Sequence, residues 1–188
     1  MSRWAPGAAD RLRAAAVELF RAHGFEGVTV AQIADAAGVT QRTFFRHFAD
    51  KREVLFDGEN SLQTAMVAGV LDAPRDAQPL EVARVALHRA AAFFTPERHE
   101  YSTARRQLIE ANPSLSEREH YKMRALSDAV ALAFRERGMG EPAATLSAQT
   151  ALAVFSVAFR EWTTPGEPRD FAALADDALA EFRGLVAG

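Results

Sequence analysis

Apolar side chains recur at intervals of three and four residues along almost the whole chain, which is the spacing of one face of an α-helix. The first such stretch contains Leu12, Ala15, Ala16, Leu19 and Phe20. This pattern predicts a helix from about Ala9 to His23. No segment alternates apolar and polar residues in the way that is typical of a half-buried β-strand. The sequence therefore predicts an all-α fold of about nine helices.

Two short helices are predicted in succession between residues 29 and 48. Thr29 and Thr40 are of a type that caps helix N-termini, and Gly38 breaks the chain between the two helices in a tight turn. The second helix ends near Phe48. Two short helices joined by a tight turn are the sequence form of a helix-turn-helix, whose second helix enters the major groove of DNA.

Proline, glycine and capping residues divide the rest of the chain into six longer helices. Their expected ranges are 51–71, 80–94, 95–111, 116–137, 143–163 and 170–186. The last two have wide apolar faces that need to be covered, so we expect a homodimer through this pair. A monomeric bundle with a thick core is the alternative. The uncharged run at 142–159 contains Pro, Thr, Ser and Gln and is interpreted as a buried bundle helix, so no membrane partner is expected.

The second short helix sorts its side chains onto two faces at about 100° per residue. Phe44 and Phe48 share one face, which must be the core face, and no acid occurs from residue 36 to residue 49. Gln can bond to adenine and Arg to guanine, while Thr, His and Lys suit phosphate. The candidate DNA contacts are Thr29, Gln41, Arg42, Thr43, Arg46, His47 and Lys51. The alternative is that the arginines form only the solvated face of an ordinary bundle.

The net charge of −3 argues by itself against a nucleic-acid binder, but the charge is unevenly distributed. Residues 1–52 hold eight Lys and Arg against five Asp and Glu, a balance of +3, and residues 53–188 hold fourteen against twenty, a balance of −6. A basic head on an acidic body fits a DNA-reading module joined to a second domain. The absence of cysteine excludes disulfides, thiol catalysis and zinc fingers. The first residues lack an apolar signal core, so we expect a cytoplasmic protein.

The chain shows no motif of an enzyme or of a cofactor site. It has no GxSxG nucleophile elbow, no phosphate loop and no dinucleotide fingerprint. His88, His99 and His120 do not have the spacing of a tight metal site. We therefore expect no catalysis, no cofactor and no metal.

Residues 12–55 closely resemble the DNA-binding domain of the TetR family of bacterial transcriptional regulators. The matching segments are AAVELFRAHGFEGVTVAQIADAAGV at 15–39 and TFFRHFADKREVL at 43–55. The resemblance implies an all-helical homodimer with a helix-turn-helix domain at 1–52 and an effector-binding and dimerisation domain at 53–188. It also implies that the fourth helix links the two domains and that the last two helices form the dimer interface.

The function implied by the resemblance is that of a ligand-responsive repressor. Such a protein binds a palindromic operator in double-stranded DNA as a homodimer and is released by a small-molecule effector, which the sequence does not identify. An activator or a ligand-independent DNA binder is an alternative within the same class. An alternative of another class is a helical small-molecule-binding protein whose helix-turn-helix is vestigial.

The family pattern also implies which residues approach bases and which hold the DNA backbone. Gln41 and Arg42 would approach bases. The backbone contacts would be Thr43, the aromatic residue at 45, His47 and Lys51. The family usually has Tyr where this chain has Phe45, and Phe45 has no hydroxyl to donate to a phosphate, a difference of about 1 kcal/mol for one neutral hydrogen bond. We therefore expect Phe45→Tyr to tighten operator binding or to leave it unchanged.

An effector pocket in this architecture would lie among the fourth to eighth helices. The aromatic candidates for its wall are Phe93, Phe155, Phe159 and Trp162. The polar candidates for binding the effector are His88, Tyr101, Arg105, Glu110, His120 and Tyr121. Among them, Arg105 could neutralise an anionic group. The alternatives are a core position for each aromatic residue and an exposed helix face for each charged one.

Overall fold

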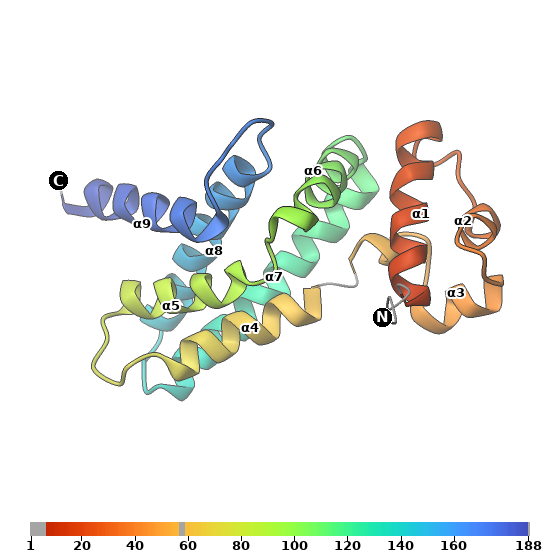
Figure 1. The fold of residues 1–188 in the computed structure, drawn as a ribbon. Coiled ribbons are helices and arrows are strands. Elements are labelled where there is room, and N and C mark those ends of the chain that lie inside the picture. The colour runs from red at the N-terminus through yellow and green to blue at the C-terminus, as the bar shows by residue number, and fades with distance from the viewer. Residues whose placement is uncertain (1–6, 57–58, 188) are drawn as a thin grey trace, which may run out of the picture. The chain divides into compact units, whose positions relative to one another are not determined.

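The computed structural model describes residues 7–56 and 59–187, and in those ranges its regular elements are all helices (Figure 1). The N-terminal elements are α1 (Ala8–His23), α2 (Val30–Ala36), α3 (Gln41–His47) and a short 3-10 helix, η1 (Glu53–Leu55). The later helices are α4 (Glu59–Asp72), α5 (Pro79–Ala91), α6 (Pro96–Glu110), α7 (Pro113–Glu136), α8 (Ala143–Trp162) and α9 (Phe171–Ala187). The prediction of an all-α fold of about nine helices is confirmed. No helix in the described ranges is long and apolar enough to cross a membrane.

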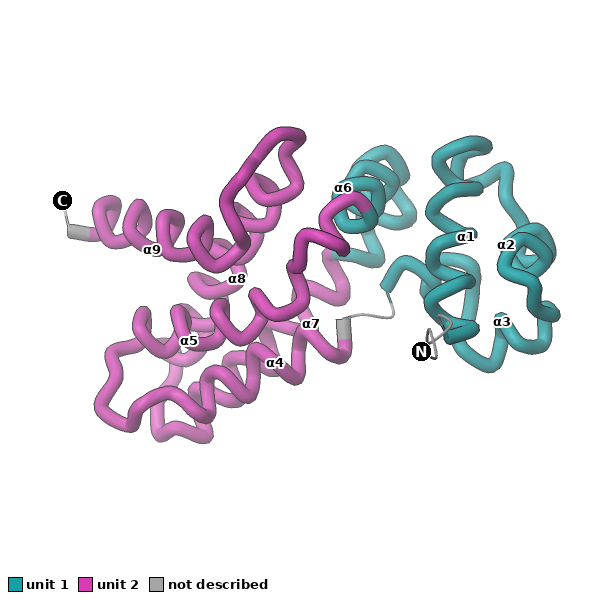
Figure 2. Tube along the Cα trace, viewed as in Figure 1, with its two compact units in different colours: residues 1–58, 101–119 teal, residues 59–100, 120–188 magenta. Residues whose placement is uncertain are grey.

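The chain forms two compact units (Figure 2). The first consists of residues 1–58 and 101–119, and the second consists of residues 59–100 and 120–188. α6 and α7 therefore each contribute residues to both units. The predicted separation of DNA binding from effector binding at residue 52 stays a prediction about function. The packing itself places 101–119 with the N-terminal helices.

The first unit has a core to which segments far apart in the sequence contribute. Its largest buried residues from α1, α2 and α3 are Leu12, Phe20, Ile33 and Phe44. The segment 101–119 adds Leu108, Ile109 and Leu115 to the same core. Because burial of apolar surface is the main stabilising contribution to folding, the N-terminal helices depend on this later segment for part of their stability.

Local hydrogen bonds fix the turn between α2 and α3. Thr29 accepts a bond from the backbone N–H of Gln32 at 3.3 Å, and the Gln32 side chain accepts one from the Thr29 backbone at 2.8 Å, which completes a capping box. After α2, Gly38 adopts a φ of 65°, and the N–H of Val39 donates to the carbonyl of Ala34 at 2.9 Å. This is a Schellman motif, which requires the left-handed conformation that glycine tolerates. α2 and α3 thus both lie within the range of 29–48 that was expected for the two short helices.

The predicted start of the fourth helix at residue 51 is wrong. Asp50 accepts a bond from the N–H of Glu53 at 3.1 Å and so caps a turn, but this turn is η1, and α4 begins at Glu59. Residues 54–56 are all buried in the first core. Three consecutive residues of an α-helix span about 200°, so a helix would turn one of them away from that core. α7 also begins three residues earlier than predicted, at Pro113, a residue suited to a first helical turn.

The second unit packs α4, α5, α8, α9 and part of α7 around a separate core. Its large, fully buried residues include Met66, Leu87, Phe134 and Leu174. α4 and α5 approach closely at Gly69, where a Cβ atom would lie 2.5 Å from the Cα of Ala86. Most of the apolar residues predicted on the last two helices are buried within the unit, and only a few remain exposed.

Candidate nucleic-acid interface

α3 is oriented by two buried rings at one side and a cap at its start. Phe44 and Phe48 are buried with ring centroids 5.3 Å apart. Thr40 caps the helix by accepting a bond from the N–H of Thr43 at 3.2 Å. The face opposite the rings is therefore presented to solvent.

The exposed face of α3 is polar and cationic. Its exposed polar residues are Gln41, Arg42, Arg46 and His47. No acid lies on α3 or beside it between residues 36 and 49. The donors of these side chains suit phosphates and the acceptor groups of bases in the major groove. The composition of this face therefore suits a nucleic acid, and no carboxylate adjoins it along the sequence.

Phe45 interrupts this polar face with an exposed ring. Its side chain is 54% exposed, the highest exposure of any large apolar residue in the described part of the first unit. The ring packs edge-to-face on Phe44, with centroids 5.5 Å apart and an interplanar angle of 81°. Phe45 is therefore held on the surface of α3 rather than in its core face.

Thr29 and Thr43 both take part in helix caps. The hydroxyl of Thr43 is half-buried and lies 3.1 Å from that of Thr40. Thr29 is exposed, with its hydroxyl 3.0 Å from the carbonyl oxygen of the Gln32 side chain. Their contacts with DNA phosphates stay predictions, and the structure assigns each a local role as well.

Lys51 lies between η1 and the end of α1 rather than in the first turn of a linking helix. Its Nζ donates to the carbonyls of Phe25 at 2.8 Å and Val28 at 3.0 Å. The same ammonium lies 4.2 Å from the centroid of the Phe25 ring, in the range of a cation–π interaction. Two of its three N–H donors thus hold the loop before α2. The predicted phosphate contact relies on the third and stays a prediction.

The aromatic residues predicted to line an effector pocket form a packed cluster instead. The ring of Phe94 lies 5.7 Å from Phe155, 5.4 Å from Phe159 and 5.3 Å from Trp162, measured between centroids. These distances are typical of direct ring contacts. In this structure the rings pack on one another, as the alternative of a core position expects, and their place in the wall of an effector pocket stays a prediction. Phe93 is half-buried in the turn after α5.

The polar residues predicted for the effector site are divided between the two units. Those in the first unit are Tyr101, Arg105 and Glu110. Those in the second unit are His88, His120 and Tyr121. Glu110 pairs with Arg106 one helical turn away at 2.8 Å, and Tyr101 packs against the first core. A single pocket lined by all six stays a prediction.

Arg105 is a structural residue of the first unit. Its Nε donates to the carbonyl of Leu55 at 2.6 Å, and its two terminal nitrogens reach the carboxylate of Glu119 at 3.3 and 2.9 Å. The guanidinium also lies 5.0 Å from the centroid of the Phe56 ring. Glu119 neutralises the guanidinium in this structure, and the binding of an anionic effector by Arg105 stays a prediction.

His88 joins α5 to α9 through a shared carboxylate. Its Nε2 lies 2.9 Å from Oδ1 of Asp176, which also accepts a bidentate pair of bonds from Arg84 at 2.7 and 2.8 Å. The hydrogen bonds from Arg84 are the largest cause that holds the pKa of Asp176 below its usual value; burial opposes this effect, and His88 adds to it. This cluster joins α5 to α9 and stabilises the second unit.

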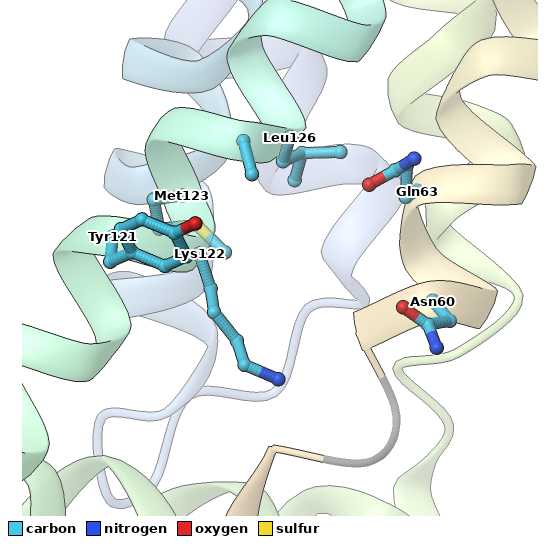
Figure 3. A pocket seen from close by; sticks show the side chains of 7 residues that line it. Asn60, Gln63, Tyr121, Lys122, Met123 and Leu126 are labelled. Atoms are coloured by element: carbon cyan, nitrogen blue, oxygen red, sulfur yellow. The ribbon is translucent and has the colours of Figure 1, made fainter.

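The second unit contains an open pocket between α4 and α7 (Figure 3). Its volume is about 190 Å³, and its lining residues are Asn60, Gln63, Tyr121, Lys122, Met123, Ala125 and Leu126. Of the predicted effector residues only Tyr121 belongs to it. Sequence analysis missed the others because exposed amides and a lysine on helices carry no pattern that distinguishes a pocket from a solvated face. No cluster of three or more His, Asp or Glu suited to a metal occurs in the described ranges.

Comparison with known proteins decides the family. Residues 12–57 match the model of bacterial regulatory proteins of the tetR family. Residues 77–186, more than half of the chain, match a second model, that of the MftR C-terminal domain. This chain belongs to the TetR family of bacterial regulatory proteins. The family predicted from residues 12–55 is thus confirmed.

Two curated TetR-type relatives match this chain over part of its length. TcmR, an HTH-type transcriptional regulator of Streptomyces glaucescens, is 44% identical over 72 residues, which cover 38% of this chain and 32% of TcmR. MftR of Mycobacterium tuberculosis, named as a mycofactocin biosynthesis transcriptional regulator, is 47% identical over 57 residues, which cover 30% of this chain and 28% of MftR. The chain thus matches about a third or less of the length of these relatives. The names of both relatives describe regulators of transcription.

A solved TetR-family structure matches nearly the whole chain. It is FadR of Thermus thermophilus, a transcriptional repressor in complex with lauroyl-CoA. The two share 25% identity with a TM-score of 0.52, and the match covers 92% of this chain and 91% of FadR. The TetR-family fold therefore extends over both units of this chain.

Proposed function

We propose that this TetR-family chain is a ligand-responsive transcriptional repressor that binds a palindromic operator as a homodimer in the cytoplasm. The observation that carries the proposal is the acid-free, exposed face of α3. Gln41 and Arg42 lie at the N-terminal end of that face, the part of a recognition helix that contacts base edges. Arg46 and His47 lie one turn further along, where they can hold phosphates.

The exposed apolar residues of the last two helices support the homodimer. Leu146 and Val157 on α8 and Leu185 and Val186 on α9 remain between 49% and 80% exposed in a single chain. A second copy would bury the same residues through a two-fold axis. In such a dimer the two α3 helices would read half-sites about 34–36 Å apart, which explains why the expected operator is a palindrome.

The proposed effector acts on helices that belong to both units. α6 and α7 each run from one unit into the other, and their residues 101–119 pack against η1 in the first unit. A ligand that shifts these helices would change the contacts of η1 and thereby the position of α3. The effector and the operator must weaken each other's binding by the same factor.

Fatty acyl-CoA thioesters are the first effector class to test, since the FadR structure contains lauroyl-CoA. The pocket between α4 and α7, at about 190 Å³, is smaller than the roughly 300–1,000 Å³ of typical ligand sites. An acyl chain would therefore have to separate side chains that are packed in the second core. A ligand of this kind would stabilise the open arrangement that it creates.

The test is selection of the purified protein on a random DNA library, followed by titration of the enriched sequence at several salt concentrations. A palindrome is expected, with an affinity that falls steeply with salt because bound counterions are released. Arg42→Ala and Arg46→Ala should each lose the operator. Arg21→Ala is the matched control, since it removes one positive charge from the last turn of α1 and leaves α3 unchanged. Feeble, sequence-independent binding would contradict the proposal.

Release by an effector is then measured on that operator. Lauroyl-CoA, free laurate and coenzyme A are added separately to the preformed complex. Dissociation by the thioester alone would support an acyl-CoA effector. Tight operator binding that none of the three changes would exclude this ligand class while leaving the DNA-binding function in place.

A further inference from the structure

We infer that Phe45 is a specificity-determining residue that contacts the C5-methyl group of a thymine in the operator. The inference rests on the proposed function, in which α3 enters the major groove. It adds a contact between two apolar groups to a surface whose other members are polar. The ring that carries the contact is exposed in the free protein and lies among the candidates for base recognition.

The position of Phe45 on α3 favours bases over the DNA backbone. Phe45 lies one turn after Gln41, about 40° from it around the helix axis and about 60° from Arg42. It is therefore between the two residues that can bond to base edges. The phosphate candidates Thr43 and His47 lie on the other border of the exposed face. A ring in this place would face the floor of the groove together with its neighbours.

The chemistry of the ring selects its partner. Phe45 has no donor or acceptor, so it gains nothing from a phosphate, and contact with a charged group would strip water from that group at a cost. Among the base edges of the major groove, the thymine methyl group is the apolar one, and Phe is a residue type that contacts it. An exposed ring that covers this methyl removes apolar surface of both partners from water.

The ring is also held in place before DNA binds. Its edge-to-face contact with Phe44, at 5.5 Å and 81°, ties it to a residue that is fully buried. An anchored aromatic side chain loses little conformational entropy when it forms a contact. Phe45 is thus preorganised for recognition, whereas a long flexible side chain at this position would not be.

The experiment replaces each thymine of the selected operator by deoxyuridine, which keeps base pairing and removes only the methyl group. At one thymine position in each half-site, a single replacement should weaken binding of the unchanged protein by about fourfold, the value of one buried methyl group. Phe45→Ala should bind the thymine operator more weakly than the unchanged protein does. It should bind the thymine operator and the deoxyuridine operator with equal affinity. Phe45→Tyr keeps the ring and should keep the preference for thymine.

His47→Ala is the matched control in the same helix, and it should weaken binding to both operators by the same factor. Because Phe45 is exposed, Phe45→Ala should leave the thermal unfolding midpoint nearly unchanged, which separates lost contact from lost folding. The contrary outcome is that Phe45→Ala lowers the affinity for the thymine operator and for the deoxyuridine operator by the same factor, so that the variant keeps the preference for thymine. The ring would then contact sugar, and the inference would be overturned. It is likewise overturned if no thymine methyl matters to a protein that binds its operator selectively. Absence of selective DNA binding overturns the proposed function itself.

Discussion

The Nε atom of Arg105 donates to the carbonyl oxygen of Leu55 at 2.6 Å, so a residue of α6 holds the turn that follows the helix-turn-helix. The same guanidinium binds Glu119 on α7, and its side chain is only 14% exposed. One arginine thus connects three segments of the first unit. The N-terminal helices α1, α2 and α3 are therefore stabilised by residues more than fifty positions away from α3 in the sequence.

Replacing Arg105 by Ala should lower the free energy of unfolding by about 2–3 kcal/mol. The change leaves the Leu55 carbonyl and the Glu119 carboxylate without a partner in a largely buried place. Urea unfolding followed by circular dichroism measures the effect. Arg89→Ala is the control, since Arg89 pairs with Asp72 at the surface, where loss of a pair costs less than about 1 kcal/mol. Equal losses in the two variants would show that Arg105 is not a structural centre.

Lys51→Met should reduce stability and DNA affinity together. The variant keeps the apolar stem but loses the bonds to the carbonyls of Phe25 and Val28, which costs about 1–3 kcal/mol for bonds from a charged donor. If the third N–H also contacts a phosphate, the slope of log affinity against log salt falls by about one. Thermal unfolding and operator titration measure the two effects separately. Arg52→Ala, a change at the adjacent exposed cation, serves as the control; an unchanged salt slope in Lys51→Met would limit Lys51 to the structural role.

The Arg84–Asp176–His88 cluster should make the second unit sensitive to acid. Because the pKa of Asp176 is lower in the folded state than its usual value of 3.8, the ionised carboxylate stabilises the fold above that pH. This contribution is lost as the pH falls through the lower, folded pKa. Asp176→Asn should therefore be less stable than the unchanged protein at pH 7, by up to about 1 kcal/mol for a partly exposed site. This difference in the free energy of unfolding should shrink below pH 3.8. Asp128→Asn is the control, because Asp128 is an exposed residue of α7, and it should be as stable as the unchanged protein at both pH values.

Val157→Glu should convert the proposed dimer into a monomer. Val157 on α8 is 49% exposed, and a buried, unpaired carboxylate in a two-fold interface would occur twice and oppose association. Light scattering coupled to size exclusion gives the mass. Leu132→Glu is the matched control, because Leu132 is similarly exposed, at 52%, but lies on α7. Dimers of equal strength in both variants would place the interface elsewhere.

The helix-turn-helix could be predicted from sequence because short-range bonds define it. Thr29 and Gln32 are three residues apart, and so are Thr40 and Thr43, so their caps are visible as spacing. Gly38 marks its turn because the backbone there has a positive φ. The orientation of α3 also follows from spacing, since Phe44 and Phe48 lie one turn apart and share the core. The polar face of α3, on which the proposed DNA binding rests, can therefore be predicted from the sequence.

The contacts of the candidate effector residues cannot be predicted in this way. Arg105, His88 and Trp162 have chemical types that suit a ligand site, but each has a partner far away in sequence: Leu55, Asp176 and the ring of Phe94. Whether a polar or aromatic residue lines a cavity depends on which other helices reach it. Helical periodicity shows which residues share a face, but it does not show which other helix packs against that face.

The sequence by itself determined the helices, the caps of α2 and α3 and the polar face of α3. Hydrogen bonds between residues a few positions apart, and the faces that such residues share, depend only on helical geometry. The tertiary structure alone decided that α4 begins at Glu59, that Lys51 holds the loop before α2 and that residues 101–119 complete the first unit. Each of these outcomes reflects the burial of apolar surface, which acts between segments in space without regard to their separation along the chain.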